Sequence, residues 1–287
     1  MFDNKKYLKD ISRKRIPENR DLLEGLRLDR NERVSKWESD IINKIFSSKP
    51  GYYLSIYPNL ESIYKKISKF ISVDEENILI TSGIDGGIKS VFEISTNAND
   101  TVGVVQPTYA MYQVYSKIFK TKLFEIDFGE NLKFNYLKFE KFLETKPKVF
   151  FLPNPNQPIE SYFNTTQLSD FAKKLEKIDC LFFIDEAYYD FGSETALSLI
   201  KKFSNVIVAR TFSKGFGVPS IRLGYLISNK ENLEVLSKPR FAHESNSLSI
   251  TVGEYLIDNY EIVREYNNKV IESREKIKTE LEKIRIK

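Results

Sequence analysis

The chain has 287 residues, of which 41% are hydrophobic, so it can bury a core as one large domain or as a large domain with a smaller partner. Its formal charge of +4 comes from 44 basic and 40 acidic residues interspersed along the sequence, a pattern that argues against nucleic-acid binding. The apolar runs are far shorter than the roughly 20 residues of a membrane span, and Met1–Tyr7 lacks an apolar signal core, so we expect a globular cytoplasmic protein that binds no membrane.

Cysteine and histidine chemistry is limited by residue counts. Cys180 is the single cysteine, so an internal disulfide is excluded, and its apolar neighbours indicate a buried strand residue. His243 is the single histidine and cannot form a multi-histidine metal site, and no Ser/His/Asp set stands out. We expect no metal, and chemistry that depends on lysine, carboxylates, tyrosines or a cofactor.

Strand-like and helical patterns alternate along the chain, after a charged and weakly periodic start of about thirty residues. Helical stretches such as 87–94 and 168–175 separate several of the apolar runs, and a long amphipathic helix follows from Ile257. The alternation predicts an α/β fold with a largely parallel sheet covered on both faces. Seven runs are candidate strands: 78–81, 101–105, 122–126, 149–152, 181–184, 206–209 and 223–227.

The first candidate site lies in the segment 82–87, which follows one apolar run and opens a helix. Its glycines and the free N–H groups of the helix start would bind a phosphate, although such a turn is about as often only a tight turn. After the next run, Tyr109 could stack on a flat ring or simply pack. The segment 151–158 ends another run, where Asn156 and Gln157 could fix a ring hydroxyl or oxyanion.

Two charged residues follow the last central runs. Asp185 ends an entirely apolar run, where it is either an N-cap or, as we favour, a buried carboxylate that stabilises a cation. Lys214 lies in a small-residue loop between two apolar runs, together with Thr211, Ser213 and Arg222. It would therefore lie at an edge of the sheet, where α/β proteins bind their ligands. A phosphate cradle, an aromatic ring, amides, an acid, a lysine and an arginine together fit pyridoxal 5′-phosphate (PLP).

The motifs also resemble those of a known family. Ile56–Asn59, Pro107–Tyr112, Asn154–Pro158, Asp185–Tyr188 and Thr211–Gly217, with Arg222 eight residues beyond Lys214, match fold-type I PLP-dependent aminotransferases of class I/II in order and approximate spacing. The chain is most similar to the histidinol-phosphate aminotransferase branch. The resemblance implies a mostly parallel seven-stranded sheet covered on both faces and a truncated small C-terminal domain. We expect an arm over residues 1–32, a large PLP-binding domain over 33–235, and an interdomain helix with an incomplete small domain over 236–287.

The resemblance also implies residue roles. Lys214 would bind the cofactor aldehyde covalently and move the substrate proton, with a pKa lowered by desolvation and Arg222. Asp185 would keep the pyridinium nitrogen protonated. Tyr188 and either Asn156 or Gln157 would hold the phenolic oxygen. The phosphate would bind the backbone at Gly83, Ile84 and Asp85 and the side chains of Thr211, Ser213 and Arg222, with Tyr57 reaching in from the second subunit of a homodimer.

Two departures keep alternatives open. Gln157 stands where the family has the ring-contacting asparagine, and Lys287 precedes the sheet that carries the family's substrate-carboxylate arginine. Our leading hypothesis is amino transfer between a small amino compound, with or without a phosphate group, and a 2-oxo acid such as 2-oxoglutarate. The second is a PLP-dependent decarboxylase or lyase of a phosphorylated amino acid, because threonine-phosphate decarboxylases resemble this branch. The third is a catalytically impaired binding or assembly protein.

Overall fold

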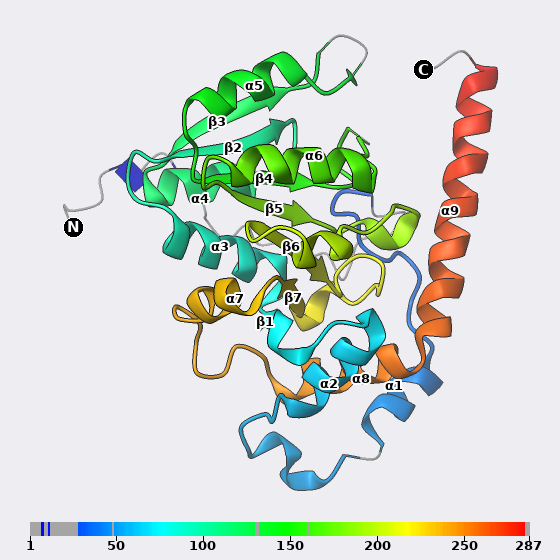
Figure 1. Ribbon diagram of the computed structural model, residues 1–287. Coiled ribbons are helices and arrows are strands. Elements are labelled where there is room, and N and C mark those ends of the chain that lie inside the picture. The colour runs from blue at the N-terminus through cyan, green and yellow to red at the C-terminus, as the bar shows by residue number, and fades with distance from the viewer. Residues whose placement is uncertain are drawn as a thin grey trace.

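A seven-stranded sheet forms the centre of the molecule (Figure 1). The computed structural model describes residues 7–8, 11, 28–47, 49–129, 132–159 and 161–284. Every one of the seven apolar runs lies in or overlaps a strand, so the prediction of a seven-stranded sheet is confirmed. The strands are β1 (Ile78–Thr81), β2 (Thr101–Gln106), β3 (Lys122–Asp127), β4 (Val149–Pro153), β5 (Leu181–Asp185), β6 (Val206–Thr211) and β7 (Gly224–Ile227).

The sheet is mostly parallel, as predicted, and its strand order is β1-β7-β6-β5-β4-β2-β3. The exception is β7, which pairs antiparallel with both β1 and β6. The direction of β7 follows from the segment that joins it to β6, residues 212–223, all of which are described. This segment contains only one short 3-10 helix, Pro219–Ile221, whereas a parallel neighbour would require a longer crossover, usually a helix, to return the chain across the sheet. This connection also carries Lys214.

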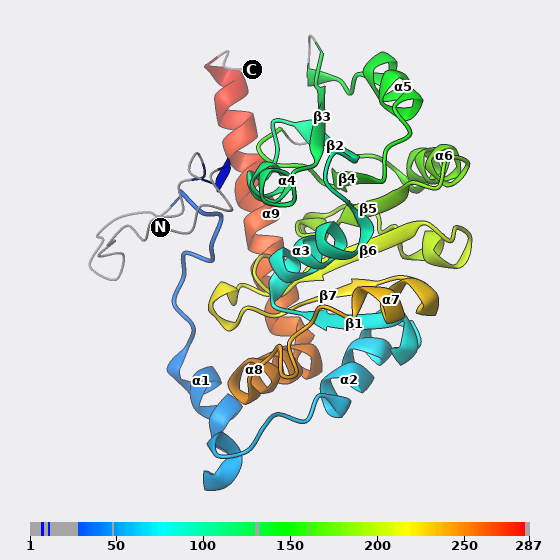
Figure 2. The ribbon, with the colours of Figure 1, turned by 90° about the vertical axis from the view of Figure 1, so that its left-hand side faces the viewer.

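Helices cover both faces of the sheet, as the alternation predicted (Figure 2). One apolar cluster joins α3, α4 and α7 to one face, and a second joins α2, α5, α6, α8 and the start of α9 to the other. The helices are α1 (Ser39–Phe46), α2 (Glu61–Ile71), α3 (Gly83–Ser95), α4 (Met111–Phe119), α5 (Tyr136–Glu144), α6 (Thr165–Glu176), α7 (Lys230–Leu236), α8 (Ser247–Asp258) and α9 (Tyr260–Lys283).

Local sequence signals explain these elements. The central strands β4, β5 and β6 are buried almost throughout and are continuous apolar runs, as a strand covered on both faces requires. The stretches 87–94 and 168–175, predicted as helical, lie within α3 and α6. Helix α6 begins with a capping box in which Asn164 and Gln167 exchange side-chain and backbone hydrogen bonds. Asn135 and Asn246 cap α5 and α8 in the same N-terminal position.

The long helix predicted from Ile257 is α9, which begins at Tyr260, and it is preceded by α8, which was not predicted. Helix α8 packs against α2, the chain breaks at Asn259, and α9 runs along one side of the sheet (Figures 1 and 2). Every residue of the described chain from Glu272 to Ile284 is exposed. Most of the predicted arm, residues 1–32, lies outside the described residues, and the domain boundaries stay predictions. Among the residues described, no helix combines the length and the apolar character needed to cross a membrane.

Candidate active site

The ends of β1, β2, β4, β5 and β6 meet around a cavity of about 510 Å³. The five strands are mutually parallel, so their carboxyl ends lie at one edge of the sheet, where open α/β sheets bind ligands. Ten of the residues singled out in the sequence line this cavity, and Gly83, Asn156 and Tyr57 do not. The ten are Ile84, Asp85, Tyr109, Gln157, Asp185, Tyr188, Thr211, Ser213, Lys214 and Arg222.

Lys214 is half-buried and held by the N-terminal segment. Its Nζ donates hydrogen bonds to the carbonyl oxygens of Arg30 at 3.0 Å and Asn31 at 3.2 Å. Burial lowers the pKa of Lys214; Glu32 opposes this effect and Arg222 adds to it. The predicted direction of this pKa shift is therefore confirmed, with desolvation as its main cause. A lysine with a lowered pKa holds a larger neutral fraction, which is the form that acts as base or nucleophile.

Asp185 ends β5 and is 5% exposed. Its Oδ2 accepts a hydrogen bond from the Tyr112 hydroxyl at 2.7 Å, and its Oδ1 accepts one from the Ala187 N–H at 3.0 Å. Burial raises the pKa of Asp185 to about 6, and both hydrogen bonds act against this rise. The carboxylate is one strand away from Lys214, because β5 pairs with β6 as predicted. A buried acid at a cavity wall favours a cationic ligand.

Beside the cavity, the start of α3 lies next to the cation of Arg222. Gly83 begins α3 with φ 68°, and a Cβ added there would lie 2.9 Å from Nη2 of Arg222. Arg222 Nη1 donates to the Pro219 carbonyl and to Ser213 Oγ, and the backbone N–H of Ser213 donates to Thr211 Oγ1. The first N–H groups of a helix have no partner within the helix. This corner can therefore bind an anion through N–H groups, hydroxyls and a guanidinium.

Two tyrosines form further walls of the cavity. The Tyr109 hydroxyl donates to Asp85 Oδ1 at 2.8 Å, and Asp85 Oδ2 lies 3.6 Å from Arg222 Nη2, so the acid of α3 fixes both side chains. The Tyr188 hydroxyl accepts a hydrogen bond from Asn31 Nδ2 at 3.0 Å. Lys214 Nζ lies 5.7 Å from the centre of the Tyr188 ring. The phenol of Tyr188 is thus within the same chamber as the lysine.

The two amide residues after β4, Asn156 and Gln157, differ in their surroundings. Asn156 is 4% exposed, accepts from Thr108 Oγ1 at 2.7 Å, and donates to the carbonyls of Pro107 and Ile159 at 3.1 Å. Gln157 is exposed and lines the cavity. Of the two alternatives left open for a ring contact, the geometry favours Gln157, because the amide of Asn156 already ties two loops together.

A second cavity of about 490 Å³ adjoins the first and shares Asn31, Glu32, Gln157, Tyr188 and Lys214 with it. Its remaining wall comes from the loop after β4, the residues following β5, and α9. Arg33 and Arg274 are among the lining residues, beside apolar and aromatic groups. Lys214 and Tyr188 therefore stand between two chambers, which gives space for a cofactor and a substrate on either side of the lysine.

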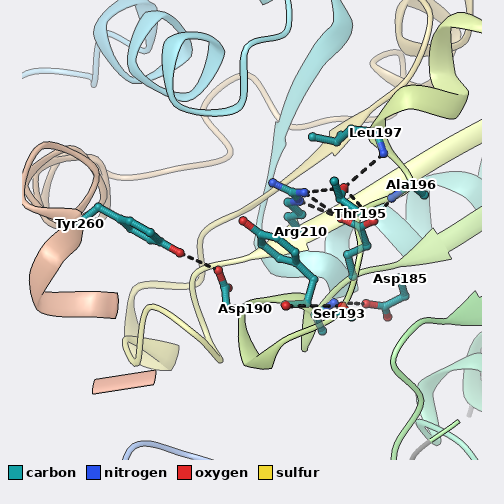
Figure 3. Close-up of polar contacts among 11 residues, drawn as sticks. Asp185, Asp190, Ser193, Thr195, Ala196, Leu197, Arg210 and Tyr260 are labelled. Carbon is teal, nitrogen blue, oxygen red and sulfur yellow. Dashed lines mark hydrogen bonds and ion pairs between the residues drawn. The ribbon is translucent and has the colours of Figure 1, made fainter. Parts of the chain in front are cut away.

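A buried polar cluster supports the loop that carries Lys214 (Figure 3). Arg210 of β6 pairs with Glu186 at 2.9 Å, donates to Thr195 Oγ1 at 2.7 Å, and stacks on the ring of Tyr189. Burial alone would lower the pKa of Arg210, but Glu186 holds the guanidinium charged and raises it.

Asp190 extends this support to α9. It accepts a hydrogen bond from the Tyr260 hydroxyl at 3.0 Å (Figure 3), and a Cβ added at Gly215 would lie 2.2 Å from Asp190 Oδ2. The residue after the lysine must therefore be glycine. The cluster links the residues after β5 to β6 and α9, and Asp190 lies against Gly215, the residue next to Lys214.

Sequence reasoning missed Tyr112, Arg30, Asn31 and the Glu186–Arg210 pair. Tyr112 follows Tyr109 by three residues at the start of α4, and helical spacing would have placed both on one face. The contacts of Lys214 with residues 30 and 31 span more than 180 positions and carry no local signal. Tyr57 is 77% exposed and stacks on His243 with ring centres 4.0 Å apart, so it does not join this chain's own site.

Comparisons with known proteins agree with this architecture. The family model for aminotransferase class I and II matches residues 39–287. A histidinol-phosphate aminotransferase from Clostridium novyi (strain NT) is 32% identical over 262 residues, which are 90% of this chain and 73% of that protein. A dihydroxyacetone phosphate transaminase from Campylobacter jejuni is 27% identical over 249 residues, which are 85% of this chain and 67% of that protein.

A solved structure shares the fold. The crystal structure of histidinol-phosphate aminotransferase from Sinorhizobium meliloti in complex with PLP aligns with a TM-score of 0.79 at 20% identity, over 86% of this chain and 68% of that one. The family match covers most of the chain, so the motifs identified the family correctly. The chain belongs to the class I and II aminotransferases and is a PLP-dependent enzyme similar to histidinol-phosphate aminotransferases.

Proposed function

We propose that this enzyme transfers an amino group between a phosphorylated amino compound of the histidinol phosphate type and a 2-oxo acid such as 2-oxoglutarate, with Lys214 as its catalytic base. The observation that carries the proposal is the position of Lys214 Nζ, in the wall between the two cavities and with a lowered pKa. Two of the related proteins are named for different substrates, histidinol phosphate and dihydroxyacetone phosphate, and both of these compounds are phosphate esters. Their names support a phosphorylated substrate for this enzyme.

The residues of the first cavity fit PLP at each of its polar groups. The backbone N–H groups at Gly83, Ile84 and Asp85, together with Thr211, Ser213 and Arg222, would bind the phosphate, since a Cβ at Gly83 would fill that cradle. Asp185, buried at the wall of the cavity, would accept a hydrogen bond from the protonated ring nitrogen and so keep it protonated. Tyr109 would stack on the ring, and Gln157 and Tyr188 would orient the ring oxygen.

The chain's own groups can then move one proton. PLP, when bound, supplies an electron-poor ring that stabilises negative charge on the substrate's α-carbon. Lys214 Nζ, partly neutral because burial lowers its pKa, would take the proton from that carbon and return it. The carboxylate of Asp185, which the Tyr112 hydroxyl and the Ala187 N–H hold in place, would orient the N–H group of the ring. Tyr188 beside the amine would limit the access of water to it.

The second cavity suits the rest of the substrate. Its charged lining includes two arginines, Arg33 and Arg274, and one acid, Glu32. The excess of positive charge favours a phosphate or carboxylate group of the substrate. Tyr162, Phe191 and Tyr266 supply aromatic surface for a flat or apolar side chain. We propose that the substrate lies in this chamber with its amino group directed at Lys214.

We also propose a cytoplasmic homodimer. Tyr57 would reach the phosphate site of the second subunit, because it is 77% exposed and is not among the residues that line the cavity of its own chain. The same segment also exposes Tyr52, Leu54 and Ile56. A group of neighbouring exposed apolar side chains favours contact with another protein surface.

The test is amino transfer by the purified protein. The protein loaded with PLP is incubated with histidinol phosphate and 2-oxoglutarate, and glutamate formation is followed. We expect glutamate with the intact chain and a loss of at least about 10³-fold with Lys214→Ala. In a parallel assay with a phosphorylated amino acid such as threonine phosphate in place of histidinol phosphate, release of carbon dioxide without glutamate would favour the decarboxylase and contradict transamination. Full activity in Lys214→Ala would remove the central role of the lysine.

A further inference from the structure

Tyr112 is a tyrosine whose whole side chain lies in the core. It is 0% exposed and belongs to the first turn of α4, and its ring packs against Phe151 with centres 5.1 Å apart. Its hydroxyl donates to Asp185 Oδ2 at 2.7 Å. Burial and the nearby carboxylates raise the pKa of Tyr112 well above its usual value, so the phenol stays protonated and remains a donor. A phenylalanine would fill the same space without that hydrogen bond.

The contacts of Asp185 show why this donor matters. A buried carboxylate is costly unless hydrogen bonds or a cation compensate its charge. Asp185 receives two donors, the Ala187 N–H on Oδ1 and the Tyr112 hydroxyl on Oδ2, one from the turn after β5 and one from α4. Each oxygen still has a lone pair, and the residue lines the cavity. Tyr112 therefore fixes the rotation of the carboxylate as well as its charge.

We propose that Tyr112 is a positioning residue that keeps Asp185 ionised and aimed at the ring nitrogen of PLP. The inference rests on the proposed cofactor role of Asp185. Tyr109 supports the arrangement, because its hydroxyl binds Asp85 at the same cavity and its ring meets Tyr112 edge to face at 6.1 Å. Two phenols three residues apart, Tyr109 just before α4 and Tyr112 in its first turn, thus hold two carboxylates, one on α3 and one on β5.

The pH dependence of the protein without cofactor is the first readout. The folded-state pKa of Asp185, about 6, lies above its ordinary value, so its burial stabilises the fold at low pH and this stability is lost as pH rises through 6. Removal of the Tyr112 hydroxyl raises that pKa further. Tyr112→Phe should therefore lose more stability between pH 5 and pH 8 than the unchanged chain. The titratable groups that face Asp185 are Asp85, Tyr109, Tyr112, Glu186, Tyr188 and Lys214.

The second readout is the affinity for PLP, measured by equilibrium titration at pH 8. We expect Tyr112→Phe to bind PLP about tenfold more weakly, because a hydrogen bond to a charged group is lost. In an Asp185→Asn background, the same Tyr112 change should alter the affinity less than about twofold, since the charge it supports is gone. Tyr136→Phe is the control, because its hydroxyl binds Gln167 outside both cavities, and it should match the unchanged chain in both readouts.

Each result of the pH and affinity measurements either supports or overturns the proposal. An equal loss of affinity from Tyr112→Phe in both backgrounds would mean a packing role and overturn the proposal, as would identical pH curves for Tyr112→Phe and the unchanged chain. Failure of the unchanged chain to bind PLP would instead overturn the proposed cofactor site, and the pH comparison would still test the Tyr112–Asp185 pair. If Tyr112→Phe does not fold at pH 8 but folds at pH 5, the pH prediction is met in its strongest form.

Discussion

At the scale of single residues, the anion-binding corner at the start of α3 requires a residue without a Cβ at position 83. Gly83 has φ 68°, a backbone conformation that glycine adopts without cost, and the Arg222 guanidinium occupies the space next to its α-carbon. Arg222 itself has φ 50°, which directs its side chain back over the start of α3. Two residues with positive φ therefore form the cradle, and the strain of the non-glycine one is offset by its contacts with Pro219 and Ser213.

Gly83→Ala should weaken PLP binding by about tenfold or more and lower stability by about 1–2 kcal/mol, because the methyl group displaces Arg222 and the positive φ becomes strained. Titration with PLP and urea unfolding measure the two effects. Gly129→Ala is the matched control, since a Cβ there meets its nearest atom at 3.8 Å. Equal behaviour of the two variants would contradict the cradle.

At the scale of elements, the end of β5 is joined to β6 by a buried ion pair. Glu186 is 1% exposed and Arg210 is 4% exposed. Glu186 also accepts from Thr195 and from the Ala196 N–H, so the connection between the strands is fixed to the same carboxylate. Because Glu186 directly follows Asp185 and Arg210 lies four residues before Lys214, we expect this pair to maintain the separation of Asp185 and Lys214.

Glu186→Gln should destabilise the fold by about 3–5 kcal/mol, because it leaves Arg210 as a buried charge without its ionic partner. Urea unfolding at neutral pH gives the measurement. The control is Glu93→Gln on α3, whose exposed pair with Lys89 contributes little. A loss in Glu186→Gln no larger than in the control would show that the pair is dispensable.

At the scale of the whole molecule, the sequence was sufficient for the strands but not for their arrangement. Runs such as 149–152 and 181–184 are apolar throughout, so burial on both faces was readable from composition. The antiparallel direction of β7 depends on the shape of residues 212–223, which no periodicity reveals. Helix α8 also escaped prediction, because its buried residues 249–253 are consecutive and lack the spacing of an amphipathic helix.

The candidate site was predictable to a similar degree. Residues that end strands, such as Asp185 and Lys214, follow from the strand assignment, since parallel strands bring their carboxyl ends together. Tyr112 and the carbonyls of Arg30 and Asn31 act through tertiary contacts, and their residue types are ordinary in a core or a loop. The contacts of Asn156 also needed the structure, because its amide donates to backbone carbonyls of two different loops.

A dimer with shared sites predicts complementation between two defective chains. Lys214→Ala keeps an intact Tyr57, and Tyr57→Ala keeps an intact lysine, so a mixed dimer has one site with both groups. Equimolar unfolding and joint refolding should restore up to about one quarter of the normal sites, because half of the dimers are mixed and each has one complete site. Activity no higher than the average of the two separate variants would contradict a Tyr57 that crosses the interface.

The most direct test of the central claim is to trap PLP on the protein with borohydride and to locate the added mass by peptide mapping. The expected result is a single modified peptide that contains Lys214, the amine whose pKa is lowered by burial at the cavity wall. The same treatment of Lys214→Arg should leave that peptide unmodified. Stoichiometric modification of another lysine, or none in the unchanged chain, would contradict the assignment of Lys214 as the residue that binds the cofactor.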